Sequence, residues 1–316
     1  MYDLIIIGGG PGGIAAGIYA SRKKMNTAII TDSFGGQSLV SADIQNWIGT
    51  KSLSGLSLAD ALESHLRSQG GIEIIDGDRV EKVENLEKGF SAGGGPASGW
   101  KVTTKNGKTL ETKTILVASG SRHRRLGIPG EDRLDGKGVV WCSTCDAPLF
   151  GGKDVAVVGA GNAGLEAVRD CLPYASKIYL LIRGDSVKGD AQTFEEIKKN
   201  PKVEIIYRAD AQEILGDNFV SGIKYLDKKD DSLKELKVEG VFIEIGAIPN
   251  SDFLGDLVKK NEFNAVLADK FQKTSLSGIW AAGDVTDLPY RQNNISAGDA
   301  IKAVLDINDY LSKLSS

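Results

Sequence analysis

The sequence has few of the residues that bind metals or cross-link secreted proteins. Its 316 residues include only 3 cysteines and 2 histidines. A structural zinc site needs about four such ligands, and Cys142 and Cys145 have no second pair to complete one, since the other candidates are Cys171, His65 and His123. Small secreted folds carry more cysteines than this. We therefore expect no metal centre and a reducing compartment.

An excess of either charge and a long apolar run are also missing. The 38 basic and 42 acidic residues leave a net charge of −4, and no basic run is interleaved with aromatic residues, which argues against nucleic acid or an anionic membrane as a partner. Apolar runs stay far below the ~20 residues that span a bilayer. Met1 leads directly into a strand pattern without the features of a signal peptide. These features predict a soluble cytoplasmic protein of two domains.

Two cysteines lie close together in the segment Trp141–Asp146. Cys142 and Cys145 are separated by two residues at an expected loop-to-helix turn. This spacing can close a small disulfide ring, and a helix N-terminus would stabilise one sulfur as a thiolate. The pattern favours a redox-active dithiol. Half of a degenerate metal site and an inert buried pair are the alternatives.

A glycine-rich turn follows the first expected strand, 4–7, and small residues at helical spacing follow the turn. The glycines fit the pattern Gly-x-Gly-x-x-Gly and are Gly8, Gly10 and Gly13. In a dinucleotide-binding fold, these positions make the turn, admit a pyrophosphate and let the helix pack on the strand. A second expected strand, 27–31, ends at Asp32, which is placed to accept from a ribose 2′-hydroxyl. A purely structural turn is the alternative.

The same motif returns 151 residues later. An expected strand over 155–158 leads to Gly159, Gly161 and Gly164, and the strand expected over 177–182 ends at Arg183. The residue at the ribose position has therefore changed from a carboxylate to a guanidinium, which suits the 2′-phosphate of NADPH. Lys188 would support Arg183 in this role. A solvated basic surface is the alternative.

The remaining pattern predicts an α/β fold with two Rossmann-like domains of the three-layer ββα type, the second inserted into the first. The expected domains are 1–120 with 247–316, and 121–246. Further strands are expected as a β-meander over 72–117, as a buried strand over 114–120 that ends in small residues, and at 204–207, 220–226, 236–245 and 278–282. Helices are expected over 53–69 and 295–314. Gly283 and Asp284 follow the last strand, where a Rossmann domain can bring a side chain to a cofactor.

Together these motifs resemble low-molecular-weight thioredoxin reductase. The motifs are Gly8-x-Gly10-x-x-Gly13, Gly36-Gln37, Cys142-x-x-Cys145-Asp146, Gly159-x-Gly161-x-x-Gly164, Ala281-Ala282-Gly283-Asp284 and Tyr290-Arg291-Gln292. The resemblance covers essentially the whole sequence. It extends to the flavoprotein part of alkyl hydroperoxide reductase, whose N-terminal thioredoxin-like domains have no counterpart in the 316 residues.

The resemblance implies an NADPH-dependent thioredoxin-disulfide reductase that works as a homodimer. Electrons would pass from NADPH, or alternatively NADH, through FAD and the Cys142–Cys145 dithiol to thioredoxin or another thioredoxin- or glutaredoxin-like protein. In the domain expected over 1–120 and 247–316, the residues implied for FAD are Gly8, Gly10, Pro11, Gly13, Asp32, Gly36, Gln37, Asn46, Gly120, Gly283, Asp284, Arg291 and Gln292. In the inserted domain, the residues implied for NADPH are Gly161, Asn162, Ala163, Gly164, Arg183 and Lys188, with Gly246 close to the hinge.

The resemblance also implies that Cys145 faces the flavin and Cys142 attacks the partner. Neither histidine lies near a plausible proton-transfer site, so Asp146 is the candidate acid; capping a helix is its alternative role. Because the dithiol and the nicotinamide site fall in one domain and the flavin in the other, we expect the two to take turns at the flavin by domain rotation. Gly120 and Gly246 flank the crossings.

One departure from the family pattern keeps other functions open. The family has His-Arg-Arg and a further arginine at its NADPH site, whereas this sequence has Ile182-Arg183-Gly184 and Lys188. The same flavin reductase could therefore be fed by ferredoxin, or it could use NADH and serve a peroxidase system. A redox sensor that binds FAD without turnover is the non-enzyme alternative.

Overall fold

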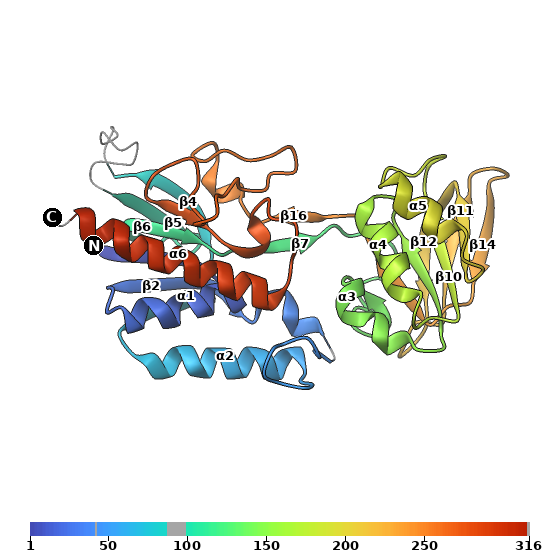
Figure 1. The fold of residues 1–316 in the computed structure, drawn as a ribbon, viewed down its shortest axis with the longest axis horizontal. Helices are drawn as coiled ribbons and strands as arrows, with labels where there is room; N and C mark the ends of the chain where they lie inside the picture. The colour runs from blue at the N-terminus through green and yellow to red at the C-terminus, as the bar shows by residue number, and fades with distance from the viewer. Residues whose placement is uncertain (42, 87–98, 315–316) are drawn as a thin grey trace. The chain divides into compact units, whose positions relative to one another are not determined.

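The computed structural model describes residues 1–41, 43–86 and 99–314 (Figure 1). The chain divides into two compact units, Met1–Arg122 with Ile248–Ser316, and His123–Ala247. The predicted α/β class, with one unit inserted into the other, is confirmed. Two short strands, β7 (Ser121–His123) and β16 (Ala247–Pro249), pair with each other where the chain leaves and re-enters the first unit.

The first unit is built on a parallel sheet. Its strands are β1 (Tyr2–Gly9), β2 (Thr27–Phe34), β3 (Ile72–Asp76), β6 (Thr109–Val117) and β17 (Ile279–Ala281). They run in the order β3-β2-β1-β6, and β17 pairs with β6. The chain segment after the insertion thus adds a strand to the sheet that the N-terminal segment begins. The carboxyl ends of these strands meet at one edge, as they do in other parallel sheets.

An antiparallel meander covers one face of this sheet. It consists of β4 (Val80–Asn85), β5 (Trp100–Thr104) and the first half of β6. The predicted meander was wrong in including 72–76, because β3 pairs in parallel with β2. Ile72 and Ile74 pack against the helical face of the sheet and Ile75 packs against the other face. Apolar contacts on both faces suit a parallel sheet strand.

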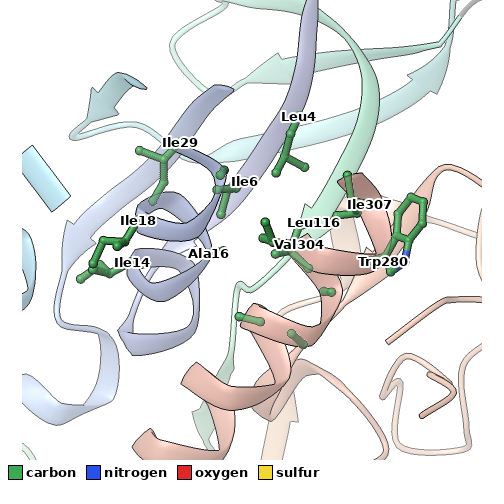
Figure 2. Close-up of a cluster of buried hydrophobic side chains, with 14 of the residues drawn as sticks. Leu4, Ile6, Ile14, Ala16, Ile18, Ile29, Leu116, Trp280, Val304 and Ile307 are labelled. Carbon is green, nitrogen blue, oxygen red and sulfur yellow. The ribbon is translucent and has the colours of Figure 1, made fainter. Parts of the chain in front are cut away.

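Helices cover the opposite face of the sheet. They are α1 (Pro11–Arg22), α2 (Gly55–Gln69) and α6 (Asn293–Leu314), and α1 packs against both α2 and α6. Figure 2 shows apolar side chains of α1 and α6 meeting those of the strands beneath them. The labelled members of this core are Leu4, Ile6, Ile14, Ala16, Ile18, Ile29, Leu116, Trp280, Val304 and Ile307. Helix, sheet and meander make three layers.

The second unit repeats the three layers. Its parallel sheet has the order β11-β10-β9-β15-β8. These strands are β8 (Val139–Val140), β9 (Asp154–Val158), β10 (Lys177–Ile182), β11 (Val203–Tyr207) and β15 (Gly240–Ile243). The antiparallel layer comprises β12 (Ala209–Leu215), β13 (Gly222–Asp227) and β14 (Ser232–Leu236), and the helices are α3 (Ser143–Asp146), α4 (Asn162–Cys171) and α5 (Ala191–Lys198).

The sequence prediction for this unit needs correction, chiefly in the antiparallel layer. The strand expected over 236–245 is wrong, because β14 ends at Leu236 in the antiparallel layer and β15 lies in the parallel sheet. Strand β12 was not predicted. Its polar and apolar residues alternate imperfectly, because the strand has a bulge at Ala211 and Glu213.

Four short 3-10 helices complete the described elements: η1 (Gly36–Val40), η2 (Ala147–Phe150), η3 (Asp252–Leu254) and η4 (Gly283–Val285). Within the described ranges, no helix has the length and apolar character that crossing a bilayer would take.

Candidate functional sites

A cavity of about 800 Å³ opens in the first unit at the carboxyl ends of β1, β2 and β6. Ligands in open parallel sheets bind at this edge. Nine of the predicted FAD residues line the cavity, namely Gly8, Gly10, Pro11, Asp32, Gly36, Gln37, Gly120, Gly283 and Asp284. They come from both segments of the first unit, so the cavity depends on the strand that the last segment adds.

The glycine turn presents the start of α1 to this cavity. Gly10 is the N-cap of α1 and supplies no side-chain hydrogen bond, so the first-turn N–H groups lack a capping side chain and suit a phosphate. A Cβ at Gly10 would have Gly36 Cα, at 4.0 Å, as its nearest neighbour. A Cβ at Gly13 would instead lie 1.8 Å from the carbonyl oxygen of Gly8. Gly13 therefore lets α1 pack on β1, and Gly10 leaves room for a ligand to approach the start of α1.

Two polar side chains on the cavity wall fit FAD. The Oε1 atom of Gln37 is buried and has no hydrogen-bond partner within the described chain, although Nε2 donates to Ser121 Oγ at 3.3 Å. Burial raises the pKa of Asp284, while the Arg291 charge and a hydrogen bond from Ser296 Oγ at 3.3 Å act in the opposite direction. A ligand rich in N–H and hydroxyl donors would satisfy both acceptors, and FAD carries such groups on its ring and ribityl chain.

Three residues predicted for the flavin ring lie outside the cavity wall. Asn46 Nδ2 donates to Gln292 Oε1 at 3.0 Å, and Asn294 Nδ2 donates to the Asn46 carbonyl at 2.7 Å. Arg291 is close enough to Asp284 to influence its pKa. The structure thus gathers Asn46, Arg291 and Gln292 near the start of α6. Gly13 is also off the wall, since it packs against β1.

Sequence reasoning missed three cations of the wall, Arg79, Lys105 and Arg122, and the first two lie on the antiparallel meander side. Arg79 immediately precedes β4, and Lys105 immediately follows β5. The backbone N–H of Lys105 donates to the Arg79 carbonyl at 2.8 Å, which brings the two residues together. Their positions at strand ends were the available signal, but the pairing of β4 with β5 was needed to use it.

The second glycine motif has the same local geometry in the second unit. Gly161 is the N-cap of α4, again without a side-chain hydrogen bond, and a Cβ there would meet nothing within 4 Å. A Cβ at Gly164 would lie 2.3 Å from the Gly159 carbonyl oxygen. Ala163 is in the first turn of α4. A second dinucleotide turn is therefore possible at the end of β9.

The loop after β10 folds against this turn. The Lys188 N–H donates to the Ala160 carbonyl at 2.8 Å, and the Asp190 N–H donates to Asn162 Oδ1 at 2.7 Å. Arg183 directly follows β10, in which Leu181 lies opposite Val158 of β9. Arg183 and Lys188 are exposed and form no ion pair with any described residue. Arg183 and Lys188 therefore lie beside the turn as two cations that can bind an anionic ligand.

Arg208 is a further cation that sequence reasoning missed here. It directly follows β11, its N–H donates to the Gly184 carbonyl at 3.0 Å, and its guanidinium forms an ion pair with Asp185. Because β10 and β11 are parallel neighbours, their carboxyl ends bring the two loops together. A charged residue at the end of a strand was the only signal, and the strand order was needed to interpret it.

The paired cysteines form a disulfide in the second unit. Cys142 is the N-cap of α3, and its Sγ accepts the Cys145 N–H at 3.2 Å. The hydroxyls of Ser143 and Thr144 donate to one oxygen of Asp170 on α4, at 2.9 and 3.2 Å. These bonds fix the short helix α3, and with it the disulfide, against α4.

Asp146, the candidate acid, is the last residue of α3, and its side chain makes no capping hydrogen bond to η2. Burial raises the pKa of its carboxyl to about 7, although a hydrogen bond from the Cys142 N–H acts in the opposite direction. A group that titrates near neutral pH can hold a proton for a neighbouring thiolate. By contrast, burial and nearby carboxylates raise the pKa of the Cys171 thiol to about 12, which makes that thiol unreactive.

The two glycines predicted at the crossings lie one residue before the paired strands, Gly120 before β7 and Gly246 before β16. Their φ angles are +65° and +101°, in the region that favours glycine over other residues.

No group of three or more His, Cys, Asp or Glu side chains is arranged to hold a metal ion within the described ranges.

The sequence matches known proteins along nearly its whole length. Residues 2–302 match the family described as pyridine nucleotide-disulphide oxidoreductase. The chain is 36% identical over 310 residues to the NADH dehydrogenase of Bacillus subtilis, covering 98% of this chain and 58% of that protein. It is 37% identical over 310 residues to an alkyl hydroperoxide reductase protein of Staphylococcus epidermidis, covering 98% of this chain and 59% of that protein.

The fold is similar to that of a thioredoxin reductase from Streptococcus pyogenes, with a TM-score of 0.90, 31% identity and coverage of 99% of both chains. The resemblance that the motifs indicate is thereby confirmed. The chain spans less than three-fifths of the length of the curated relatives named above.

Proposed function

Because this chain belongs to the pyridine nucleotide-disulphide oxidoreductase family, we propose that it is a flavin-dependent disulfide reductase. It would carry electrons from NADPH through FAD and the Cys142–Cys145 pair to the disulfide of a thioredoxin-like protein. The observation that carries this proposal is the disulfide itself, held at the start of α3, which ends at Asp146.

The cavity of the first unit is the proposed FAD site, and the turn after β9 is the proposed NADPH site. Bound FAD would supply a carrier that accepts a hydride and returns an electron pair to a disulfide. Around it, Gly10 and the start of α1 would hold the pyrophosphate, Asp32 the ribose, and Gln37 and Asp284 the polar groups of the flavin half. Arg183 would bind the 2′-phosphate of NADPH.

The reduced cysteines would act by thiol–disulfide exchange. The Cys142 thiolate attacks one sulfur of the partner's disulfide and releases the other as a thiolate. Cys145 then attacks Cys142 Sγ, which restores the Cys142–Cys145 bond and frees the second sulfur of the partner. Asp146 would hold the proton that the departing sulfur takes up.

Coenzyme choice tests this proposal. Anaerobic stopped-flow bleaching of the flavin should be faster with NADPH than with NADH, because Arg183 is free to bind the 2′-phosphate. Arg183→Ala should raise the NADPH concentration for half-maximal bleaching by roughly 10- to 100-fold, the loss of one to two charge-assisted contacts, and leave NADH unchanged. Arg169→Ala removes an exposed arginine from α4, away from the turn, and is the matched control.

Two other outcomes would replace the NADPH assignment. Faster bleaching by NADH, unaffected by Arg183→Ala, would favour an NADH-dependent reductase, and Gly184 together with the name of the Bacillus subtilis relative supports this second candidate. Bleaching by a reduced ferredoxin alone would favour a non-nicotinamide donor. No bleaching by any donor would rule out the reductase proposal.

The partner and the assembly are also proposals. Thioredoxin is the partner named by the similar solved structures, and alkyl hydroperoxide reductase relatives point instead to a peroxidase system. We propose a thioredoxin-like partner and a homodimer. Turnover of an isolated thioredoxin, followed through nicotinamide oxidation, is the direct assay.

A further inference from the structure

A second carboxyl lies beside the dithiol, on an element that the sequence motifs do not include. Glu244 directly follows β15, and its N–H donates to the Val158 carbonyl at 2.9 Å. Its side chain accepts a hydrogen bond from the N–H of Ser143, the residue after Cys142. Its carbonyl oxygen would lie 2.2 Å from a Cβ at Gly159. Glu244 thus lies between the glycine turn after β9 and the helix that carries the disulfide.

The surroundings of Glu244 are acidic. Asp146 on α3, and Glu166 and Asp170 on α4, all lie close enough to disfavour its negative charge, and Glu244 also acts on the Cys171 thiol. No lysine or arginine of the described chain forms an ion pair with Glu244, Asp146 or Asp170. Burial is the largest cause that raises the pKa of Glu244, to about 8, and the Ser143 N–H opposes it only in part. Near neutral pH the protonated form of this carboxyl is therefore favoured.

We propose that Glu244 controls the reactivity of the reduced Cys142–Cys145 pair through its own protonation state. While neutral, Glu244 adds no charge, so a thiolate can form beside α3. Once ionised, it places a further negative charge next to that thiolate and shifts the equilibrium back toward the thiol. The coupling is mutual, because a thiolate also makes Glu244 hold its proton more tightly. Glu244 is a positioning residue in this scheme, since it acts on the sulfurs through its charge and through α3.

This role rests on the dithiol function proposed above, but it can be tested without nicotinamide or a protein partner. The flavin-loaded full chain is reduced with excess dithiothreitol, whose two thiols are oxidised to a ring disulfide as the Cys142–Cys145 bond opens. After the reductant is removed under anaerobic conditions, iodoacetamide is added at a series of pH values. Mass spectrometry then follows alkylation of the peptide that holds Cys142 and Cys145. Only the thiolate reacts, and the separate Cys171 peptide does not interfere.

Glu244→Gln should change the pH profile rather than the rate at every pH. The glutamine carbonyl can still accept the Ser143 N–H, so α3 should stay in place. Below about pH 7 the variant and the wild type should react equally, because Glu244 is neutral there. At about pH 9 the variant should react roughly tenfold faster, the effect of one nearby charge on a thiol. Glu196→Gln removes an exposed carboxylate from α5, one that does not act on Glu244, and should follow the wild type.

Superposed profiles for the wild type and Glu244→Gln would overturn the proposal. So would a rate change that is the same at every pH, because that would indicate a purely structural role. Should the variant not fold, infrared spectra of Asp146→Asn decide the question, because that variant lacks the other carboxyl of this cluster whose pKa burial raises, to about 7. A carbonyl band of a protonated carboxyl that is lost near pH 8 supports the proposal, and absence of any such band between about pH 6 and pH 10 overturns it. A failure of NADPH to reduce the flavin would affect the proposed function but neither of these readouts.

Discussion

Cys145→Ser should abolish turnover of a disulfide partner while leaving reduction of the flavin by the nicotinamide intact. Serine is close to cysteine in size and keeps the N–H that donates to Cys142 Sγ, so α3 should retain its position. A hydroxyl cannot form a disulfide, however, and the variant has no group that can store an electron pair and release a mixed disulfide. Steady-state turnover should fall by at least ~10³-fold, and stopped-flow bleaching should change by less than about twofold.

The matched control for this prediction is Cys171→Ala. Cys171 is buried in the helical core of the second unit, and its thiol pKa is raised to about 12. It should therefore play no part in thiol exchange, and its removal should leave turnover within about twofold of the wild type. Turnover above a few per cent in Cys145→Ser, with Cys171→Ala unchanged, would contradict the relay.

Substitution of one glycine in each of the two glycine turns should affect flavin binding in one case and reduction by NADPH in the other. In Gly13→Ala the new Cβ would lie 1.8 Å from the Gly8 carbonyl oxygen, so α1 must move off β1. We expect the purified variant to lose its flavin and about 3 kcal/mol or more of unfolding free energy, at the upper end for overpacking. Gly164→Ala makes the same clash in the second unit, at 2.3 Å from the Gly159 carbonyl. That variant should keep its flavin but no longer be reduced by NADPH.

Gly298→Ala is the control for both substitutions. Gly298 is exposed on α6, where a Cβ would meet nothing within 4 Å. Alanine in an exposed helix interior should add about 0.5–1 kcal/mol of stability, measured by denaturant unfolding together with flavin absorbance. If Gly13→Ala bound flavin as the wild type does, or if Gly164→Ala lost flavin first, the assignment of FAD and NADPH to the two turns would be reversed or wrong.

Local signals in the sequence were sufficient for much of the fold. Strand β10 has the predicted bounds, and α6 begins two residues before its prediction. These elements have strong periodicity and lie next to glycine turns whose chemistry allows few alternatives. The repeat of Gly8 at Gly159 also predicted two copies of one architecture, because each turn must follow a buried strand and precede a helix.

The parts that were missed depend on contacts between distant segments. The alternation in 72–76 is compatible with either kind of sheet, and only its pairing with β2 makes β3 parallel. Arg208 is close to Asp185 because β11 lies beside β10, and Glu244 meets Ser143 because β15 lies between β8 and β9. A charged residue after a short apolar run is a signal only of a strand end, and it does not say which other residues that end meets. Such residues become candidates only when the strand order is known.

The central claim is that the chain stores electrons in two places, a bound flavin and the Cys142–Cys145 bond. An anaerobic titration of the purified flavoprotein with dithionite counts them directly. The account predicts about four electrons per chain for the wild type, two for the flavin and two for the disulfide, and about two for Cys145→Ser. Uptake of only two electrons by both proteins, or a wild-type protein that binds no flavin, would contradict it.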